Sequence, residues 1–129
     1  MKSNMVGWFE IPVTDMDRAV KFYNEVFQIK IAVHHMGELI MGWFPMAEDS
    51  EAKGASGSLM YHKEFYKPSQ EGALVYFTSR SGDINEELSR IEKAGGKILK
   101  PKTQISPDHG FMALFLDPEG NRVALHSLK

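Results

Sequence analysis

The sequence predicts an α+β domain made of two βαβββ modules, with paired curved sheets around a cleft. The main observation is a repeat: segments typical of a strand, a helix and three strands follow one another twice along the 129 residues. In addition, MGWF at 41–44 has the same place in the first half as MALF at 112–115 in the second. We therefore expect a single domain, with module one at about 5–62, a linker at 63–71 and module two at about 72–128.

Module one begins with a β-rich run at residues 6–13. Alternation puts Trp8 and Glu10 on one face of this strand and its apolar residues on the other. Thr14, with Asp17 three residues later, predicts the start of a helix capped by the threonine side chain. The apolar residues of this helix recur at helical spacing: Met16, Ala19, Phe22, Tyr23, Val26 and Phe27.

Three further strands are expected to complete module one, at residues 29–33, 39–44 and 56–62. The stretch between the last two, residues 45–57, is rich in Glu, Asp, Ala, Ser and Gly. Such a composition predicts a mobile loop, which can act as a lid.

Module two repeats the same order. A strand at 73–78 precedes a helix that begins at Asp83, with Glu86 three residues on, and that the glycine pair at 95–96 ends. The sequence DPEGN at 117–121 has the residues of a tight turn, so it predicts a hairpin between the last two strands. The three final strands are expected at 97–99, 111–116 and 123–128.

Composition excludes several classes of function. The absence of cysteine removes disulfides, thiolate metal sites and thiol nucleophiles, and it fits a reducing, cytoplasmic location. A net charge of -2, with scattered basic residues, argues against a nucleic-acid partner and an anionic membrane surface. No secretory signal opens the chain, and no apolar stretch approaches the length of about 20 residues that spans a bilayer.

Three fragments, in this order and spacing, carry a resemblance to a known family. They are FEIPVTDMDRA at 9–19, which leads into Phe22 and Tyr23, then IEKAGGK at 91–97 and FLDPEGNRV at 115–123. In them the chain resembles the vicinal-oxygen-chelate superfamily, which includes glyoxalase I, extradiol dioxygenases, fosfomycin-resistance proteins and bleomycin-binding proteins. The resemblance implies a homodimer, with clefts where modules meet, sometimes between subunits.

The family's enzymes hold a divalent metal that two neighbouring substrate oxygens chelate. The resemblance maps the metal-ligand positions onto Trp8, Leu74 and Ala124, with a fourth near Ser58 or Met60. The first three side chains have no lone pair to give a metal. We therefore expect the standard metal site to be absent and no cofactor to be needed, with a divalent ion possible only at a displaced site.

Polar residues remain one pleat, roughly 6–7 Å, away from the missing metal ligands. Alternation predicts that Glu10, His62 and His126 form a polar tier there. Such a tier is suited to a relocated metal or to acid–base catalysis, and equally to hydrogen-bonded groups that line a cleft. The residues predicted to line the ligand-binding cleft are Trp8, Glu10, Met60, Leu74, Tyr76, Arg122, Ala124 and His126.

Three functions follow, in order of preference. The first is a metal-free member of the superfamily that binds a small apolar or aromatic molecule, on which Trp8 and Tyr76 would stack. The second is an enzyme of the lyase, isomerase or dioxygenase type, with Glu10, His62 and His126 as catalytic residues. The third is a ligand-responsive module that acts by associating with another protein.

Overall fold

The structure, a computed structural model, describes residues 3–49 and 51–129. Ser50, within the predicted loop at 45–57, and the first two residues of the chain lie outside this description. The elements, in chain order, are β1 (Phe9–Pro12), α1 (Met16–Phe27), β2 (Ala32–Met36), β3 (Leu39–Trp43), β4 (Gly57–Tyr61), β5 (Tyr76–Thr78), α2 (Ile84–Ile91), β6 (Lys97–Ser106), β7 (Gly110–Leu116) and β8 (Arg122–Ser127).

The strands form two four-stranded sheets, each built from one half of the chain. The first sheet has the order β1-β4-β3-β2 and the second has the order β5-β8-β7-β6. In each sheet the first and last strands of the module pair in parallel and the other pairs are antiparallel. This confirms the predicted α+β fold of two βαβββ modules. None of the helices among the described residues is long and apolar enough to cross a membrane.

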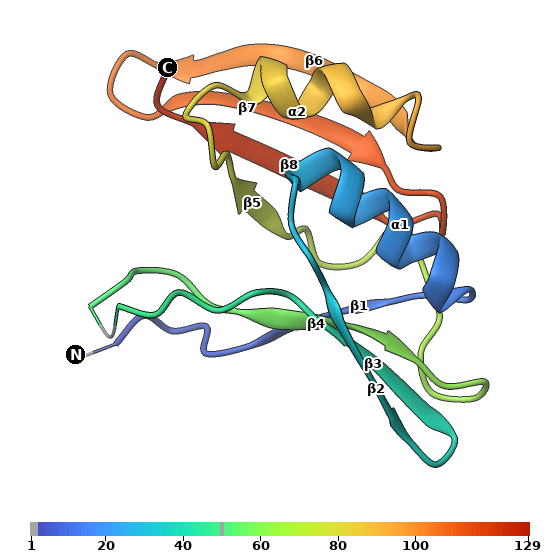
Figure 1. Cartoon of the computed structure of the whole chain (residues 1–129). Coiled ribbons are helices and arrows are strands. Elements are labelled where there is room, and N and C mark those ends of the chain that lie inside the picture. The colour runs from blue at the N-terminus through green and yellow to red at the C-terminus, as the bar shows by residue number, and fades with distance from the viewer. Residues whose placement is uncertain (1–2, 50) are drawn as a thin grey trace.

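Helix α1 lies between the two sheets, and α2 lies beside it against the second sheet (Figure 1). The ring of Phe77 in β5 therefore contacts rings of the first module. It packs against Tyr23 and Phe27 of α1 and against Phe9 and Phe44, at centroid distances of 4.9–6.0 Å. The helix-facing sides of both sheets thus share a single hydrophobic core. The opposite face of each sheet points away from that core.

Helix α1 begins one residue later than the sequence predicts. Its N-cap is Asp15, whose carboxylate accepts a hydrogen bond from the backbone N–H of Arg18 at 3.0 Å, so the prediction of Thr14 as the cap was wrong. The Thr14 hydroxyl instead donates to the carboxylate of Glu119, at 3.0 Å. The predicted apolar stripe of α1 is buried, and Asp83 caps α2 as predicted.

The turn between β7 and β8 joins the two modules at the start of α1. Glu119 Oε1 accepts hydrogen bonds from the backbone N–H groups of Thr14 and Asp15, at 2.7 and 2.8 Å, and Oε2 accepts one from Arg18 Nε at 2.6 Å. Asn121 Nδ2 donates to the carbonyl of Pro12 at 2.7 Å. A single turn of module two therefore satisfies backbone groups of β1 and of the α1 N-terminus.

Two edge strands differ from the prediction. β6 runs from 97 to 106, well beyond the predicted 97–99. Its extent was missed because residues 100–106 are mostly polar, include Pro101 and carry register shifts against β7, so they show no apolar alternation. β2 spans 32–36, where the prediction was 29–33. Ile31 is buried directly after α1 and belongs to the core, whereas every residue of β2 is exposed.

Candidate functional site

The face of the first sheet that points away from the hydrophobic core is called here the first outer face, and it is aromatic and rich in methionine. Glu10 in β1 pairs with Ser58 in β4, and Ser58 pairs with Trp43 in β3, so these three side chains lie in one row across the sheet. Trp8 lies beside this row, because its ring contacts Trp43 and its Nε1 contacts Glu10. The face includes Trp8, Glu10, Pro12, Ala32, His34, Met41, Trp43, Ser58 and Met60.

The corresponding face of the second sheet is called here the second outer face. Tyr76 pairs with Ala124 and Thr78 with His126, and β7 continues these rows with Leu114 and Met112. By alternation Leu74 and Arg122 belong to the same face. The face consists of Leu74, Tyr76, Thr78, Met112, Leu114, Arg122, Ala124 and His126.

The predicted cleft residues are thus divided between two surfaces. Trp8, Glu10 and Met60 lie on the first outer face, and the other five lie on the second. All strands belong to the described residues, and no strand of one sheet pairs with a strand of the other. Because α1 separates the sheets, one chain does not bring the predicted cleft residues together.

Backbone hydrogen bonds establish which positions of the two modules are equivalent. Val13 N donates to Met60 O at 2.9 Å, and Ser79 N donates to His126 O at 2.8 Å, so Met60 and His126 have the same place in their modules. Two residues earlier, Ser58 corresponds to Ala124. The fourth mapped metal-ligand position is therefore Ser58, which the sequence left open between Ser58 and Met60.

The four mapped positions do not fit a divalent metal. They hold Trp8, Ser58, Leu74 and Ala124, and the one hydroxyl among them, on the fully buried Ser58, donates to the carbonyl of Leu59 at 2.8 Å. Elsewhere in residues 3–49 and 51–129, no group of three or more His, Asp or Glu side chains is placed to hold a metal ion.

The residues of the predicted polar tier lie apart within one chain. By the module equivalence, Glu10 corresponds to Tyr76, in the row of Ala124, whereas His126 corresponds to Met60, one row further along its own face. His62 lies two residues beyond Met60, outside both rows. It contacts Glu38 at 3.7 Å and stacks on Phe65, with 4.7 Å between ring centroids.

His126 is engaged by the backbone. Its Nε2 lies 2.6 Å from the carbonyl oxygen of His109, which can only accept, so Nε2 carries the hydrogen of this bond. The side chain also lines a hollow of about 550 Å³ at the end of β8, together with Thr78 and Ser79. At the start of β8, on the same face, Arg122 Nε is buried and has no hydrogen-bond partner among the described residues.

Glu10 receives hydrogen bonds from two aromatic side chains. The Tyr66 hydroxyl donates to Oε1 at 2.6 Å, and Trp8 Nε1 donates to Oε2 at 3.4 Å. The bond to the Glu10 carboxylate raises the pKa of Tyr66. Sequence reasoning missed Tyr66 because it lies in the linker. Its one signal was an aromatic pair, Phe65-Tyr66, in an otherwise polar stretch.

Trp43 is the second residue that sequence reasoning missed. It packs edge-on against Trp8, with ring centroids 6.5 Å apart and an interplanar angle of 83°. The ring centroids of His34 and Trp43 are 4.5 Å apart. The exposed fractions of Trp8, Trp43 and Tyr76 are 41%, 38% and 50%, which is high for such large apolar side chains. The register of β3 could have found Trp43, because it faces the same way as Met41.

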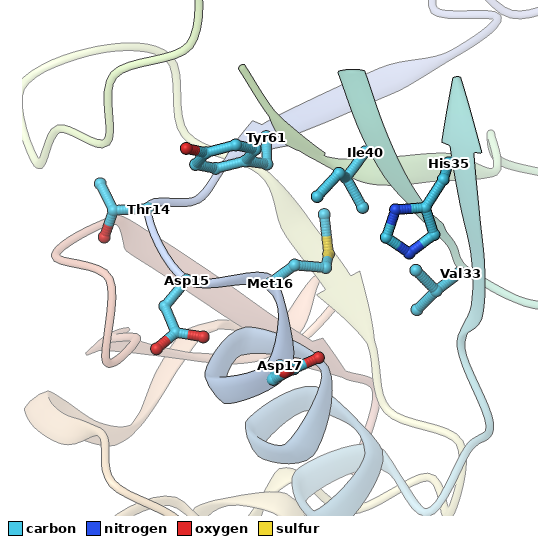
Figure 2. A pocket seen from close by; sticks show the side chains of 8 residues that line it. All are labelled: Thr14, Asp15, Met16, Asp17, Val33, His35, Ile40 and Tyr61. Carbon is cyan, nitrogen blue, oxygen red and sulfur yellow. The ribbon is translucent and has the colours of Figure 1, made fainter. Parts of the chain in front are cut away.

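A separate hollow lies on the core side of the first sheet. It measures about 300 Å³ and is formed by the start of α1 and by side chains of β2, β3 and β4, among them His35, Ile40 and Tyr61 (Figure 2). None of the predicted cleft residues lines it. His34 and His35 point to opposite faces of β2, as their adjacency predicts.

Comparisons with known proteins identify the family of the chain and other proteins with its fold. Residues 5–125 match the sequence model of the Glyoxalase/Bleomycin resistance protein/Dioxygenase superfamily. A glyoxylase-like domain-containing protein from Didymella fabae is 27% identical over 124 residues, which cover 93% of this chain and 91% of that protein.

Solved structures with the same fold include an enzyme and a binding protein. A mutant of glyoxalase I from Zea mays superposes with a TM-score of 0.73 and 22% identity, over 95% of this chain and 46% of that one, so the chain spans about half of the maize protein. An antibiotic binding protein from Streptomyces sp. CB03234 superposes with a TM-score of 0.66 and 22% identity, over 98% of both chains.

Proposed function

Because the chain belongs to the Glyoxalase/Bleomycin resistance protein/Dioxygenase superfamily, we propose that it binds a small, largely apolar or aromatic molecule and does so without a divalent metal. The observation that carries the proposal is the content of the four mapped ligand positions, Trp8, Ser58, Leu74 and Ala124. Three of them are apolar or aromatic, and the exposed rings of Trp43 and Tyr76 extend the same surface. The similar fold of an antibiotic binding protein supports a binding role.

The binding cleft in this proposal is made by two chains. Each outer face exposes large apolar side chains, and β1 and β5 are short edge strands, paired on one side only. The modules have the same fold, so a two-fold axis can set the first outer face of one chain against the second outer face of another. Equivalent positions then meet at the same level, which places Trp8 and Ser58 opposite Leu74 and Ala124 of the second chain.

The proposal is tested by titrating the protein with a panel of flat aromatic molecules while following tryptophan fluorescence. Saturable quenching is expected, and it should weaken in a Trp8→Phe variant, because that indole lies in the cleft. Trp8 and Trp43 are the only tryptophans, so a Trp43→Phe variant isolates the signal of Trp8. The absence of saturable binding across the panel would overturn the proposal.

Metal content separates this function from the enzymatic alternative. Protein incubated with Zn²⁺, Mn²⁺ or Ni²⁺ and then desalted should retain less than one ion per chain, because the mapped positions lack suitable donors. One tightly held ion per chain that a His126→Ala change removes would instead favour an enzyme built around Glu10 and His126.

A further inference from the structure

We infer that the ligand carries a positively charged nitrogen next to its aromatic body, and that the Glu10 carboxylate receives this nitrogen. The inference rests on the proposed function and names the chemical class of the ligand: an arylalkylamine, with a protonated amine on a short chain beside the aromatic ring. It is carried by the unneutralised charge of Glu10 and by the aromatic rings around it.

The charge of Glu10 has no counterpart among the described residues of its own chain. Both hydrogen-bond donors to its carboxylate, the Tyr66 hydroxyl and Trp8 Nε1, are neutral. No nitrogen of a Lys, Arg or His side chain in the described part of the chain lies within 4.0 Å of it. Because an ionised carboxylate accepts up to about four hydrogen bonds, accepting capacity remains free on both oxygens.

The side chains around Glu10 favour a cation over a neutral group. The indoles of Trp8 and Trp43 meet edge to face, so part of each ring face stays open beside the carboxylate. Aromatic faces attract cations, and indole does so most strongly. Ser58, in the same row between Glu10 and Trp43, is small and fully buried, so it adds no charge beside the carboxylate. A carboxylate flanked by indoles suits an ammonium group on a flat molecule.

Tyr66 acts as a positioning residue for Glu10. It comes from the linker between the modules, and its hydroxyl bond at 2.6 Å fixes Oε1, while Trp8 restrains Oε2 from the other side. The carboxylate is therefore oriented before a ligand arrives, which reduces the entropy lost on binding. The linker thus contributes to ligand selection as well as to chain connection.

The test compares three molecules of one shape and different charge: naphthylethylamine, naphthylethanol and naphthylacetate. Their affinities are measured by calorimetry at neutral pH, for the wild-type protein and for Glu10→Gln. Glu38→Gln is the matched control, because it removes the same charge from an exposed side chain at the turn between β2 and β3. Tyr66→Phe tests the positioning role.

Wild-type protein and Glu38→Gln should bind the amine at least about ten-fold more tightly than the alcohol, and the acetate most weakly. This preference should disappear in Glu10→Gln and should shrink in Tyr66→Phe, while affinity for the neutral alcohol stays the same in both. Equal binding of amine and alcohol by the wild type, or an undiminished preference in Glu10→Gln, would overturn the inference and leave the proposed function standing. If none of the three molecules binds, the proposed function itself fails.

Discussion

The hydroxyl of Tyr23 in α1 donates a hydrogen bond of 2.7 Å to Asp117 Oδ2, and both groups are buried. The two residues come from different modules, so this bond lies where the modules join. Asp117 Oδ1 also accepts the backbone N–H groups of Glu119 and Asn121, at 2.9 Å each. The DPEGN turn is therefore held in shape by Asp117 and attached to α1 by Tyr23.

Replacing Tyr23 with Phe should destabilise the protein by about 1–2 kcal/mol, because a buried carboxylate loses a hydrogen-bond donor that water does not replace. Burial already raises the pKa of Asp117, so its charged form is poorly solvated in the folded state. Urea unfolding followed by circular dichroism measures the change. Tyr61→Phe is the control, since the Tyr61 hydroxyl has no hydrogen bond within the described residues. Equal stability of the two variants would contradict the role of the bond.

Replacing Glu119 with Gln should cost about 1–2 kcal/mol at neutral pH, as expected for loss of a charged group at a helix N-terminus. Burial opposes ionisation of Glu119, but hydrogen bonds from Arg18, Asp15 and Thr14 outweigh it and lower its pKa. A lowered folded-state pKa means that the stabilisation is complete above the unfolded-state pKa and is lost as the pH falls through the folded-state value.

The stability difference between wild type and Glu119→Gln should therefore shrink steadily as the pH is lowered through the acidic range. Asp117 has the opposite dependence, because its raised pKa makes its contribution more favourable at low pH, but this term is common to both proteins and cancels. Unfolding curves at several pH values measure the effect, with Glu71→Gln, on an exposed residue, as the control. A difference that does not change with pH would rule out the charged contact.

Replacing Gly96 with Ala should destabilise the protein by about 1–3 kcal/mol through overpacking. A Cβ at this position would lie 2.7 Å from Phe22 Cε1 and 2.8 Å from the carbonyl oxygen of Leu116, closer than real contacts allow. Gly72→Ala is the control, because nothing lies within 4 Å of its would-be Cβ. Thermal unfolding should show a lower midpoint for Gly96→Ala only. A Gly96→Ala variant as stable as Gly72→Ala would show that the core adjusts without cost.

If the cleft is shared between two chains, two variants that each fail to bind ligand should restore binding when they are combined in one dimer. Trp8→Asp damages the first outer face and Tyr76→Asp the second, and both residues are exposed enough for the chain to fold. Each variant alone has two damaged clefts per dimer. If the two are unfolded and refolded together, half of the dimers are mixed and each of these has one intact cleft, so about a quarter of the ligand sites should return. Recovery of no sites would contradict a cleft shared between chains.

Much of the fold is predictable because its signals are local. The apolar stripe of α1 and the DPEGN turn depend on residues close together in the sequence, and alternation correctly separates Glu10 from Ile11. The helix cap was misassigned because Thr14 and Asp15 are both good caps, and the choice between them is set by Glu119, 105 residues away from Thr14. The extent of β6 was missed because an exposed edge strand needs no apolar alternation.

The arrangement of the site was predictable only in part, for a similar reason. Alternation places a side chain on one face of its own strand, but whether two such faces meet depends on how the sheets pack. Here the packing of α1 between the sheets keeps Trp8 apart from Leu74 and Ala124 within one chain. Tyr66 was missed because nothing local indicates that a linker residue reaches the carboxylate of Glu10.

The attachment of the DPEGN turn to α1 also bears on the order of folding during synthesis. The groups that complete the start of α1 and the end of β1, Glu119 and Asn121, follow them in the chain by 104 and 109 residues. These contacts therefore cannot form until module two has been synthesised through its last turn. The two halves reach their final state together, and a nascent chain that has emerged only as far as the linker exposes the core side of the first sheet.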